Sequence, residues 1–384
     1  MMEETQATDD TANVTAAKRT FGEIADDTHP ETPEPKRPKP SPDLSDVETL
    51  DSEGDVVLAI EKPDSETQEK FLVSSRVLSL ASPVFRRMFS PSFTEGRQVR
   101  NGDVPCISLE EDDAEAMRTI LRLLHFRRDN MPFELGPQAL AKIALHCDKY
   151  DVIASLEAWV QIWLDNSKFR NFATYRPEEI GLALLGGYML DRSELWLSDL
   201  ASEASKYLMP DFVSVWEQHE DLSILPETLA TRMSDHISQN LSRLQDTLLR
   251  VDESLRQTSK GYLIPGSRVC PPCGETFPGQ VEKCQCGQSL VDRYCTVESR
   301  VAEYFALLRR FDLYPFVTPF STCSLDDIDG KIAGMYALHG HTCDGLFDCP
   351  LAVAISRLDD ESRTVRTAVD FAWNCDGTEP TETP

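Results

Sequence analysis

The residues best suited to chemistry are cysteines in the last third of the chain. Residues 270–274 read Cys-Pro-Pro-Cys-Gly, and residues 284–287 read Cys-Gln-Cys-Gly. In the first motif the glycine permits a turn that directs backbone amides toward the thiolates. Four thiolates from two tight turns suit a tetrahedral structural zinc ion, which would also contribute folding free energy to a segment rich in Pro and Gly. The predicted zinc ligands are Cys270, Cys273, Cys284 and Cys286.

Other combinations of these cysteines stay open at this point. On an extended chain the two thiols of Cys-Gln-Cys point in different directions, so one of them could stand aside while Cys295 completes the site. Further residues of ligand type are Cys323, His339, His341, Cys343 and Cys349. A site that uses His341, Cys343 and Cys349 is one alternative, and free thiols in a reducing compartment are another.

Enzymatic chemistry at these cysteines is not predicted. A thioredoxin-like use of Cys270 and Cys273 requires a strand before the motif and a helix after it. Residues 265–266 (Pro-Gly) and the segment 274–279, which begins and ends with glycine, predict loops instead. Elsewhere we find no grouping of nucleophile, base and oxyanion-stabilising residues in the sequence. We therefore expect a protein without catalytic residues.

The composition favours a folded protein of the cell interior. The chain has 384 residues, of which 41% are hydrophobic, and a formal net charge of −27. A strongly negative surface repels phosphate backbones, so direct nucleic-acid binding is not expected. No apolar run reaches the ~18 residues that a membrane span needs, and the acidic start at residues 1–6 is unlike a secretory signal. We expect an intracellular protein, cytoplasmic or nuclear or both, without a membrane partner.

The first 53 residues are expected to form a disordered acidic tail. They are rich in Thr, Asp, Glu, Pro and Ser, and such a segment cannot offset the entropy lost on ordering. Within the tail, residues 35–40 read Pro-Lys-Arg-Pro-Lys-Pro, a basic island. A nuclear import receptor could bind this island, and the alternative is a solvated run of charge.

The most specific pattern of the chain begins at residue 71. Residues 71–89 read Phe-Leu-Val-Ser-Ser-Arg-Val-Leu-Ser-Leu-Ala-Ser-Pro-Val-Phe-Arg-Arg-Met-Phe. An apolar extended piece leads into a short helix at 76–80, and Ser82-Pro83 caps and begins a second helix. Further along, apolar residues at helical spacing predict a helix at 114–126.

This order of elements resembles the BTB/POZ domain over residues 55–164. The family line reads roughly F-x-(V/A)-H-(K/R)-x-V-L-x-x-x-S-P-x-F-x-x-M-F, and Ser74 and Ser75 replace its His and its basic residue, as in fungal members. The resemblance implies an α+β fold with a small, three-stranded sheet and helical hairpins over 54–166. In it, 54–60 and 106–112 would be strands, and 140–150 and 154–164 would be helices. It also implies a protein–protein interaction module used for self-association and, in many members, for docking to the cullin scaffold of a ubiquitin ligase.

The resemblance also points to a docking motif. Cullin-docking members often carry a hydrophobic-x-Glu motif after the second helix, and Phe93-Thr-Glu95 stands in that place. Phe93 would be the aromatic anchor and Glu95 would fix the register, whereas in the alternative Phe93 folds back onto its own domain. Some family members exchange a strand that precedes the first one, but residues 46–54 are too acidic to predict a strand. A dimer through helix faces stays open.

The rest of the chain is expected to be mainly helical, with a small cysteine-rich unit. A helical extension is expected at 167–262, where Gly186-Gly187 requires either a closely packed neighbour or a break in the helix. The apolar stripe within 226–260 predicts a long helix that packs inside the chain or, alternatively, forms a coiled coil. Residues 263–375 form the expected cysteine-rich region, and 376–384 a tail. A helix is expected at 297–311 with an inward face of Val301, Phe305, Leu308 and Phe311.

These features predict an assembly or adaptor protein that works through protein contacts. Its expected partners are other proteins, including a cullin scaffold and a second copy of the chain. The alternative is a plain homo- or hetero-oligomeric scaffold, or a nuclear regulatory protein, with a structural zinc site and no ubiquitin-ligase role.

Overall fold

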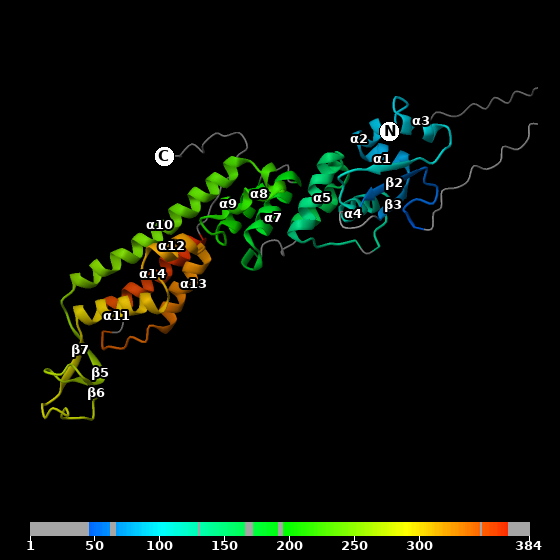
Figure 1. Cartoon of the computed structure of the whole chain (residues 1–384). Helices are drawn as coiled ribbons and strands as arrows, with labels where there is room; N and C mark the ends of the chain where they lie inside the picture. The colour runs from blue at the N-terminus through cyan, green and yellow to red at the C-terminus, as the bar shows by residue number, and fades with distance from the viewer. Residues whose placement is uncertain are drawn as a thin grey trace, which may run out of the picture. The chain divides into compact units, whose positions relative to one another are not determined.

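A four-stranded sheet lies at the centre of the N-terminal part of the computed structural model (Figure 1). The structure describes residues 46–61, 67–129, 131–165, 172–190, 195–345 and 348–367. The strands are β1 (Val47–Thr49), β2 (Val56–Glu61), β3 (Gln68–Val73) and β4 (Cys106–Leu109). Their order is β1-β3-β2-β4, with β2 antiparallel to β3 and parallel to β4. Five consecutive residues of β2 are buried, which makes it the central strand of the core.

The prediction of a three-stranded sheet with no strand at 46–54 is wrong. β1 pairs in parallel with β3 of the same chain, so that Glu48 lies opposite Phe71. The acidic residue is tolerated because the Glu48 carboxylate lies 3.1 Å from the Arg118 guanidinium and 3.2 Å from that of Arg122. Two arginines of a neighbouring helix therefore neutralise the negative charge of Glu48, which had spoken against a strand at this position.

The helical hairpin predicted around Ser82-Pro83 is confirmed. Its helices are α1 (Ser75–Ala81) and α2 (Pro83–Met88). The buried Ser82 hydroxyl accepts a hydrogen bond from the Phe85 amide (3.0 Å) and donates one to the Tyr150 carbonyl (2.5 Å). Phe85 stacks on the Tyr150 ring at 4.6 Å between centroids. The cap thus fixes both the start of α2 and its position against the end of α5.

The helices of the middle of the chain follow this hairpin in the sequence. They are α3 (Thr94–Arg100), α4 (Ala114–Leu124), α5 (Pro137–Lys149), α6 (Glu157–Asp165), α7 (Pro177–Leu190), α8 (Leu195–Ser205) and α9 (Phe212–Trp216). Short 3-10 turns lie at Ile153–Ser155, Phe172–Thr174 and Glu220–Ile224.

The two glycines of α7 mark close contacts and not a break in the helix. α7 packs along α5, and a Cβ added at Gly186 would lie 2.6 Å from Leu140 on α5. A Cβ at Gly187 would lie 2.2 Å from the Trp196 ring on α8. The first of the two alternatives, a closely packed neighbour, therefore applies.

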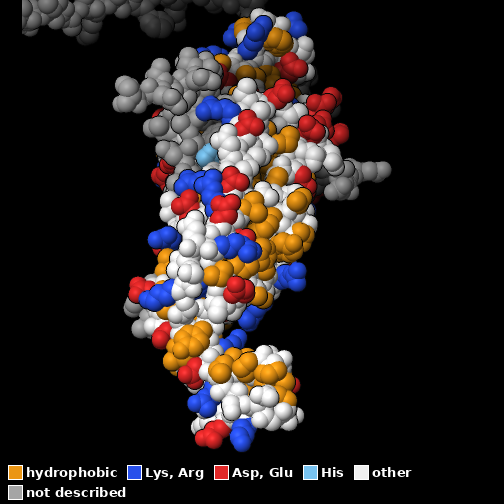
Figure 2. Space-filling model, turned by 90° about the vertical axis from the view of Figure 1, so that its left-hand side faces the viewer, with side chains coloured by type: hydrophobic (Ala, Val, Ile, Leu, Met, Phe, Trp, Pro, Cys, Tyr) orange, Lys and Arg blue, Asp and Glu red, His pale blue; other side chains and the backbone are white. Residues whose placement is uncertain are grey.

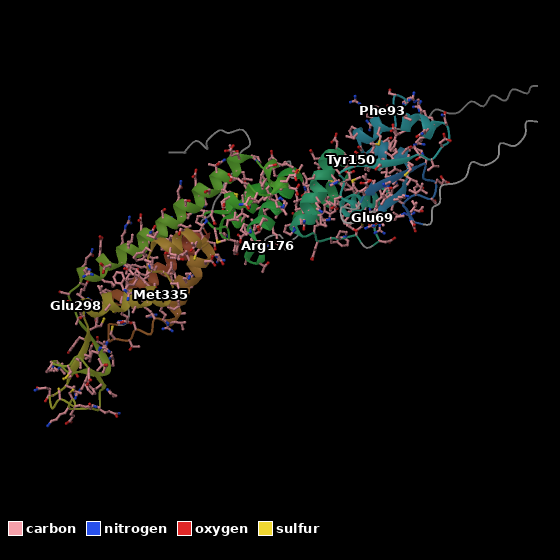
Figure 3. All side chains as sticks on the ribbon, in the orientation of Figure 1. Glu69, Phe93, Tyr150, Arg176, Glu298 and Met335 are labelled. Atoms are coloured by element: carbon pink, nitrogen blue, oxygen red, sulfur yellow. The ribbon has the colours of Figure 1, made fainter. Side chains whose placement is uncertain are left out.

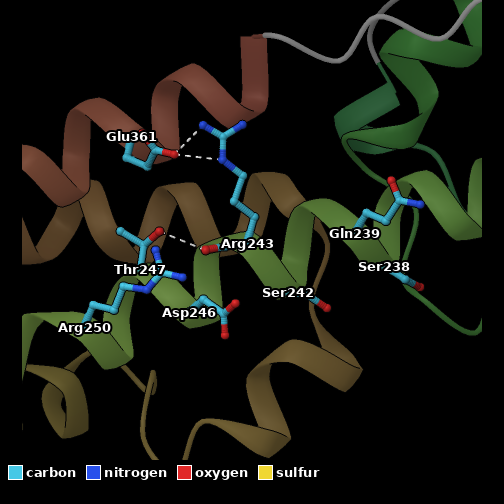
Figure 4. Close-up of a pocket in the computed structure, with 8 residues that line it drawn as sticks. All are labelled: Ser238, Gln239, Ser242, Arg243, Asp246, Thr247, Arg250 and Glu361. Carbon is cyan, nitrogen blue, oxygen red and sulfur yellow. Dashed lines mark hydrogen bonds and ion pairs between the residues drawn. The ribbon is translucent and has the colours of Figure 1, made fainter.

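The long amphipathic helix is α10 (Glu227–Gln257), and its apolar stripe packs within the chain as predicted. The eight residues of the stripe are all buried: Leu229, Met233, Ile237, Leu241, Leu244, Leu248, Val251 and Leu255. α10 packs mainly against α14 (Pro350–Thr367) and α11 (Val297–Arg310), and also against α8, α9, α12 (Val317–Thr322) and α13 (Leu325–Leu338) (Figure 1). Polar residues of α10 border an open groove of about 520 Å³, closed at one side by the ion pair between Arg243 and Glu361 (Figure 4).

The inward face of α11 differs in part from the prediction. The buried residues are Arg300, Tyr304, Leu307 and Leu308, while the expected Val301 and Phe305 are only half-buried. Arg300 turns inward because its guanidinium donates to the backbone carbonyls of Thr258 and Lys260, which follow α10. These contacts rotate the buried face by about one residue.

A small three-stranded sheet, here called the finger, follows α10 and precedes α11 (Figure 1). Its strands are β5 (Tyr262–Val269), β6 (Thr276–Pro278) and β7 (Val291–Cys295), in the order β6-β5-β7. Its apolar core is small: Cys270, Cys284 and Leu290 are buried, with Phe277 and Val281 packed against them. Figure 2 shows further hydrophobic side chains at the surface of the finger, at the bottom of the view. Such a core contributes little stability by itself.

The described residues from 46 onward form one compact unit. The division of that unit at residues 166 and 262 stays a prediction. The basic island at 35–40 and the tail at 376–384 lie outside the described residues. Among the helices that are described, none combines the length and the apolar character that crossing a bilayer requires.

Candidate functional site

The loop between α2 and α3 carries the predicted docking residues. Phe93 is the N-cap residue of α3; its amide donates to the Ser90 carbonyl (3.1 Å), and its side chain is 43% exposed. Glu95 is half-buried in the first turn of α3. Phe93, labelled in Figure 3, thus presents an aromatic ring to solvent from a fixed backbone position.

Gly96 explains why this loop is held closely against α2. A Cβ at Gly96 would lie 2.1 Å from the Ser90 carbonyl oxygen and 2.4 Å from that of Phe89. The first turn of α3 therefore sits directly on the backbone that ends α2, a distance that only glycine permits. Four cationic residues flank the loop on α2 and α3: Arg86, Arg87, Arg97 and Arg100. The docking loop is thus an ordered aromatic surface among basic side chains.

The first cysteine cluster lies in the finger and contains the four predicted ligands. Cys270 Sγ is 3.5 Å from Cys286 Sγ, and Cys273 Sγ is 3.9 Å from Cys284 Sγ. All four sulfur atoms lie within 4.8 Å of one another. Thiolates that share a tetrahedral zinc ion at about 2.3 Å are about 3.8 Å apart, so the spacing fits one such ion.

Two matching turns bring the four thiols together. The Cys270 amide donates to Glu275 O and the Cys284 amide to Gln288 O, each at 2.9 Å. Each turn is closed by a glycine with positive φ, Gly274 at +72° and Gly287 at +83°. Cys-Gln-Cys is therefore a turn and not an extended segment, and the alternative in which one of its thiols stands aside does not match the geometry.

Backbone amides also favour the charged form of one thiol. The Gln288 amide and hydrogen bonds from the neighbouring thiols lower the pKa of Cys286 to about 7, whereas the hydrogen bonds with Cys286 and Cys270 raise the pKa of Cys273. A thiolate is the form that binds zinc. Together with the small core of the finger, this donor set suits a structural metal ion at Cys270, Cys273, Cys284 and Cys286.

A second cluster lies where the finger meets the helices. Cys295 at the end of β7, His341 and Cys343 in the loop after α13, and Cys349 before α14 place their ligand atoms within 4.8 Å of one another. The sequence pointed to three of these residues, but it offered Cys295 as a substitute ligand for the first site. Cys295 lies in the second cluster instead. Cys323 and His339, also noted from the sequence, lie outside both clusters.

His341 has partners on both ring nitrogens. Its Nε2 lies 3.2 Å from Cys349 Sγ, and its Nδ1 lies 2.9 Å from a carboxylate oxygen of Glu303 on α11. The hydrogen bond with Cys349 and that with Glu303 raise the pKa of His341 to about 10. Burial alone would raise the pKa of Cys349, but His341 and the amides of Ala352 and Leu351 lower it to about 6.

Comparison with known proteins gives a family match for the N-terminal part of the described chain. A search of curated proteins found no match to the chain. The family model of the BTB/POZ domain matches residues 46–166, which include β1 to β4 and α1 to α6. The match begins at the acidic segment that forms β1, eight residues before the boundary expected at 54. The chain therefore contains a BTB/POZ domain, a member of a family of protein–protein interaction domains, at residues 46–166.

Proposed function

We propose that the protein is a non-enzymatic adaptor that assembles other proteins through its BTB/POZ domain. The observation that supports this most is the exposed Phe93 on the ordered loop between α2 and α3. An aromatic side chain on an ordered backbone loses little backbone entropy when it enters a pocket on a partner. The four flanking arginines favour an acidic surface around that pocket.

The partner we propose is the cullin scaffold of a ubiquitin ligase. Phe93 acts as the anchor, and Glu95 fixes the register of docking from the first turn of α3. The motif and its position support this partner, and the exposure of the ring makes the contact sterically accessible. A plain oligomeric scaffold, using the same domain without a cullin, is the competing role.

Capture of a purified cullin by the full chain tests the proposal. Phe93→Ala should weaken binding by about 30-fold, the effect of losing an anchor worth about 2 kcal/mol. Glu95→Ala should weaken it to a smaller extent. Phe126→Ala is the matched control, because Phe126 is a 79% exposed aromatic residue of the same domain outside the loop. Undiminished capture by both loop variants would refute the docking site, and no capture by the wild type would refute the cullin partner.

We also propose that the finger binds a structural zinc ion through Cys270, Cys273, Cys284 and Cys286. The spacing of the thiols and the two glycine-closed turns support it. The ion would replace the hydrophobic core that the finger lacks. Its part in the adaptor is to keep the finger folded.

A further inference from the structure

The second cluster has the donor set and the spacing of a closed tetrahedral metal site. Cys295 Sγ is 3.8 Å from Cys349 Sγ and 3.5 Å from His341 Nε2. Zinc bonds of about 2.3 Å to sulfur and about 2.0 Å to nitrogen give ligand separations of about 3.8 Å and 3.5 Å. With Cys343 the set is three thiols and one imidazole, a composition that occurs in structural zinc sites.

Glu303 orients the imidazole toward this site. Its carboxylate holds Nδ1 of His341 at 2.9 Å, which leaves Nε2 directed at Cys295 and Cys349. Histidines that bind metals are held in this way by a carboxylate or carbonyl on the other ring nitrogen. The imidazole is therefore positioned by a residue of α11 that is not itself in the cluster.

The loop that supplies three of the donors is anchored to β5. The Tyr262 hydroxyl donates to the Asp348 carbonyl at 2.9 Å, and the Asp344 amide donates to the Leu263 carbonyl at 2.8 Å. Gly345 lies directly against the Tyr262 ring, where an added Cβ would be 2.6 Å away. The two hydrogen bonds and the close approach of Gly345 to the Tyr262 ring hold the described residues of this loop against β5.

A thiol–imidazole–carboxylate triad is a competing interpretation of Cys349, His341 and Glu303. Such a triad activates a nucleophile, which must be accessible to a substrate. Cys349 is 0% exposed, and the sulfur of Cys295, which is also 0% exposed, lies 3.8 Å from the sulfur of Cys349. Two further thiols around the imidazole have no role in a triad, whereas a metal ion uses all four donors.

We propose that Cys295, His341, Cys343 and Cys349 bind a second zinc ion, which fastens the end of β7 to the start of α14. This site is separate from the one proposed in the finger. The ion joins segments far apart in the sequence, the finger strand on one side and the last two helices on the other. It thereby holds the finger to the helices that pack on α10.

Zinc content of the full chain, purified in chelator-free buffer, tests the proposal. The wild type should contain about two zinc ions per chain. Cys343→Ser should lose one and Cys286→Ser, in the first cluster, should lose the other. Cys323→Ser is the control, since Cys323 lies outside both clusters, and it should keep both. If the first-cluster variant alone lowers the content and the wild type holds one ion, the second site is refuted while the first stands.

Because Cys343→Ser could fail to fold, two milder variants keep the test decisive. In the cobalt-substituted protein, His341→Cys should shift the visible spectrum from that of a site with three thiolates and one imidazole toward that of an all-thiolate site. Glu303→Gln should weaken zinc binding at this site ~10–100-fold in competition with a chromophoric chelator. Glu298→Gln, an exposed position on the same helix, should not. An unchanged cobalt spectrum, iron in place of zinc, or rapid alkylation of Cys349 in the metal-loaded chain would overturn the proposal.

Discussion

His125 is a buried imidazole that links α4 to the hairpin of α1 and α2. Its Nδ1 donates to the Leu121 carbonyl at 2.8 Å, and its Nε2 accepts a hydrogen bond from the Ser74 amide at 3.1 Å. Ser74 is the N-cap residue of α1. An imidazole that accepts through one nitrogen and donates through the other is neutral, and a proton on Nε2 would remove the bond to Ser74.

The neutral form of His125 predicts a loss of stability in mild acid. Burial lowers its pKa from the ordinary value of 6.5, and the hydrogen bond to Leu121 only partly opposes this. Below about pH 6.5 the unfolded chain therefore binds a proton that the folded chain does not, and the free energy of unfolding falls as the pH is lowered. Urea midpoints measured between pH 7.5 and 5.5 should decrease for the wild type. His125→Gln should be less stable at neutral pH but should show a flatter dependence; equal slopes would contradict the assignment.

At the scale of helices, replacing a glycine of α7 by alanine should destabilise the protein, whereas helix propensity alone would predict stabilisation. Alanine is favoured over glycine inside a helix by about 1 kcal/mol. At Gly187, however, the added methyl group would lie 2.2 Å from the rigid Trp196 ring, and overpacking costs about 1–3 kcal/mol. Trp196 cannot move freely, because its indole N–H donates to the Leu164 carbonyl at 2.8 Å. Gly187→Ala should therefore lower the free energy of unfolding by up to about 2 kcal/mol, the packing cost less the gain in helix propensity.

Gly330 provides the matched control on another helix. It lies inside α13, is exposed, and has no atom within 4 Å of an added Cβ. Gly330→Ala should therefore stabilise the chain by about 0.5–1 kcal/mol, as propensity alone predicts. Chemical denaturation of both variants checks the pair. If Gly187→Ala were as stabilising as Gly330→Ala, the close packing of α7 on α8 would be wrong.

Elements specified by local sequence were predicted well, and those that depend on distant partners were not. The Ser82-Pro83 cap and the stripe of α10 follow from neighbouring residues, and both are confirmed. β1 was missed because its acidic residue is neutralised by Arg118 and Arg122, on a helix that follows much later in the chain. The buried face of α11 was misplaced because Arg300 is drawn inward by carbonyls beyond the end of α10. In both cases the position of a charged side chain depends on a partner that lies far away in the sequence.

At the scale of the whole molecule, the same distinction separates the two cysteine clusters. The first is encoded in two short motifs, so its four residues could be proposed from their spacing, although Cys295 stayed open as a substitute for one of them. The second takes Cys295 from β7 and its other donors from the segment 341–349, which the fold of α11 to α14 brings back to the finger. The spacing of these residues in the sequence does not show that Cys295 and the segment 341–349 come together in the fold. The sequence analysis named His341, Cys343 and Cys349 as one alternative set of ligands, but it did not place Cys295 with them.

The packing of α7 on α5 predicts that the BTB/POZ domain depends on the helices that follow it. Leu140 of α5 is fully buried and lies against Gly186 of α7. A fragment of residues 46–165 would expose this face, and each large apolar side chain returned to water costs about 1.5–3 kcal/mol. We therefore expect 46–165 to melt at a lower temperature and to associate more than 46–225, which keeps α7, α8 and α9.

A third fragment identifies which helix is responsible. Residues 46–190 keep α7 but lose α8, whose Trp196 indole is bonded to the Leu164 carbonyl of α6. If the packing of α7 on α5 contributes more stability than α8 does, 46–190 should recover most of the thermal stability and remain largely monomeric in light scattering. If 46–165 melts at the same temperature as the longer fragments, the domain is self-sufficient and α7 only rests on it. If 46–165 instead melts at a lower temperature than 46–190 and 46–225, the BTB/POZ domain and the helices up to α9 form one folding unit. In that unit α5 packs both within the domain and against α7.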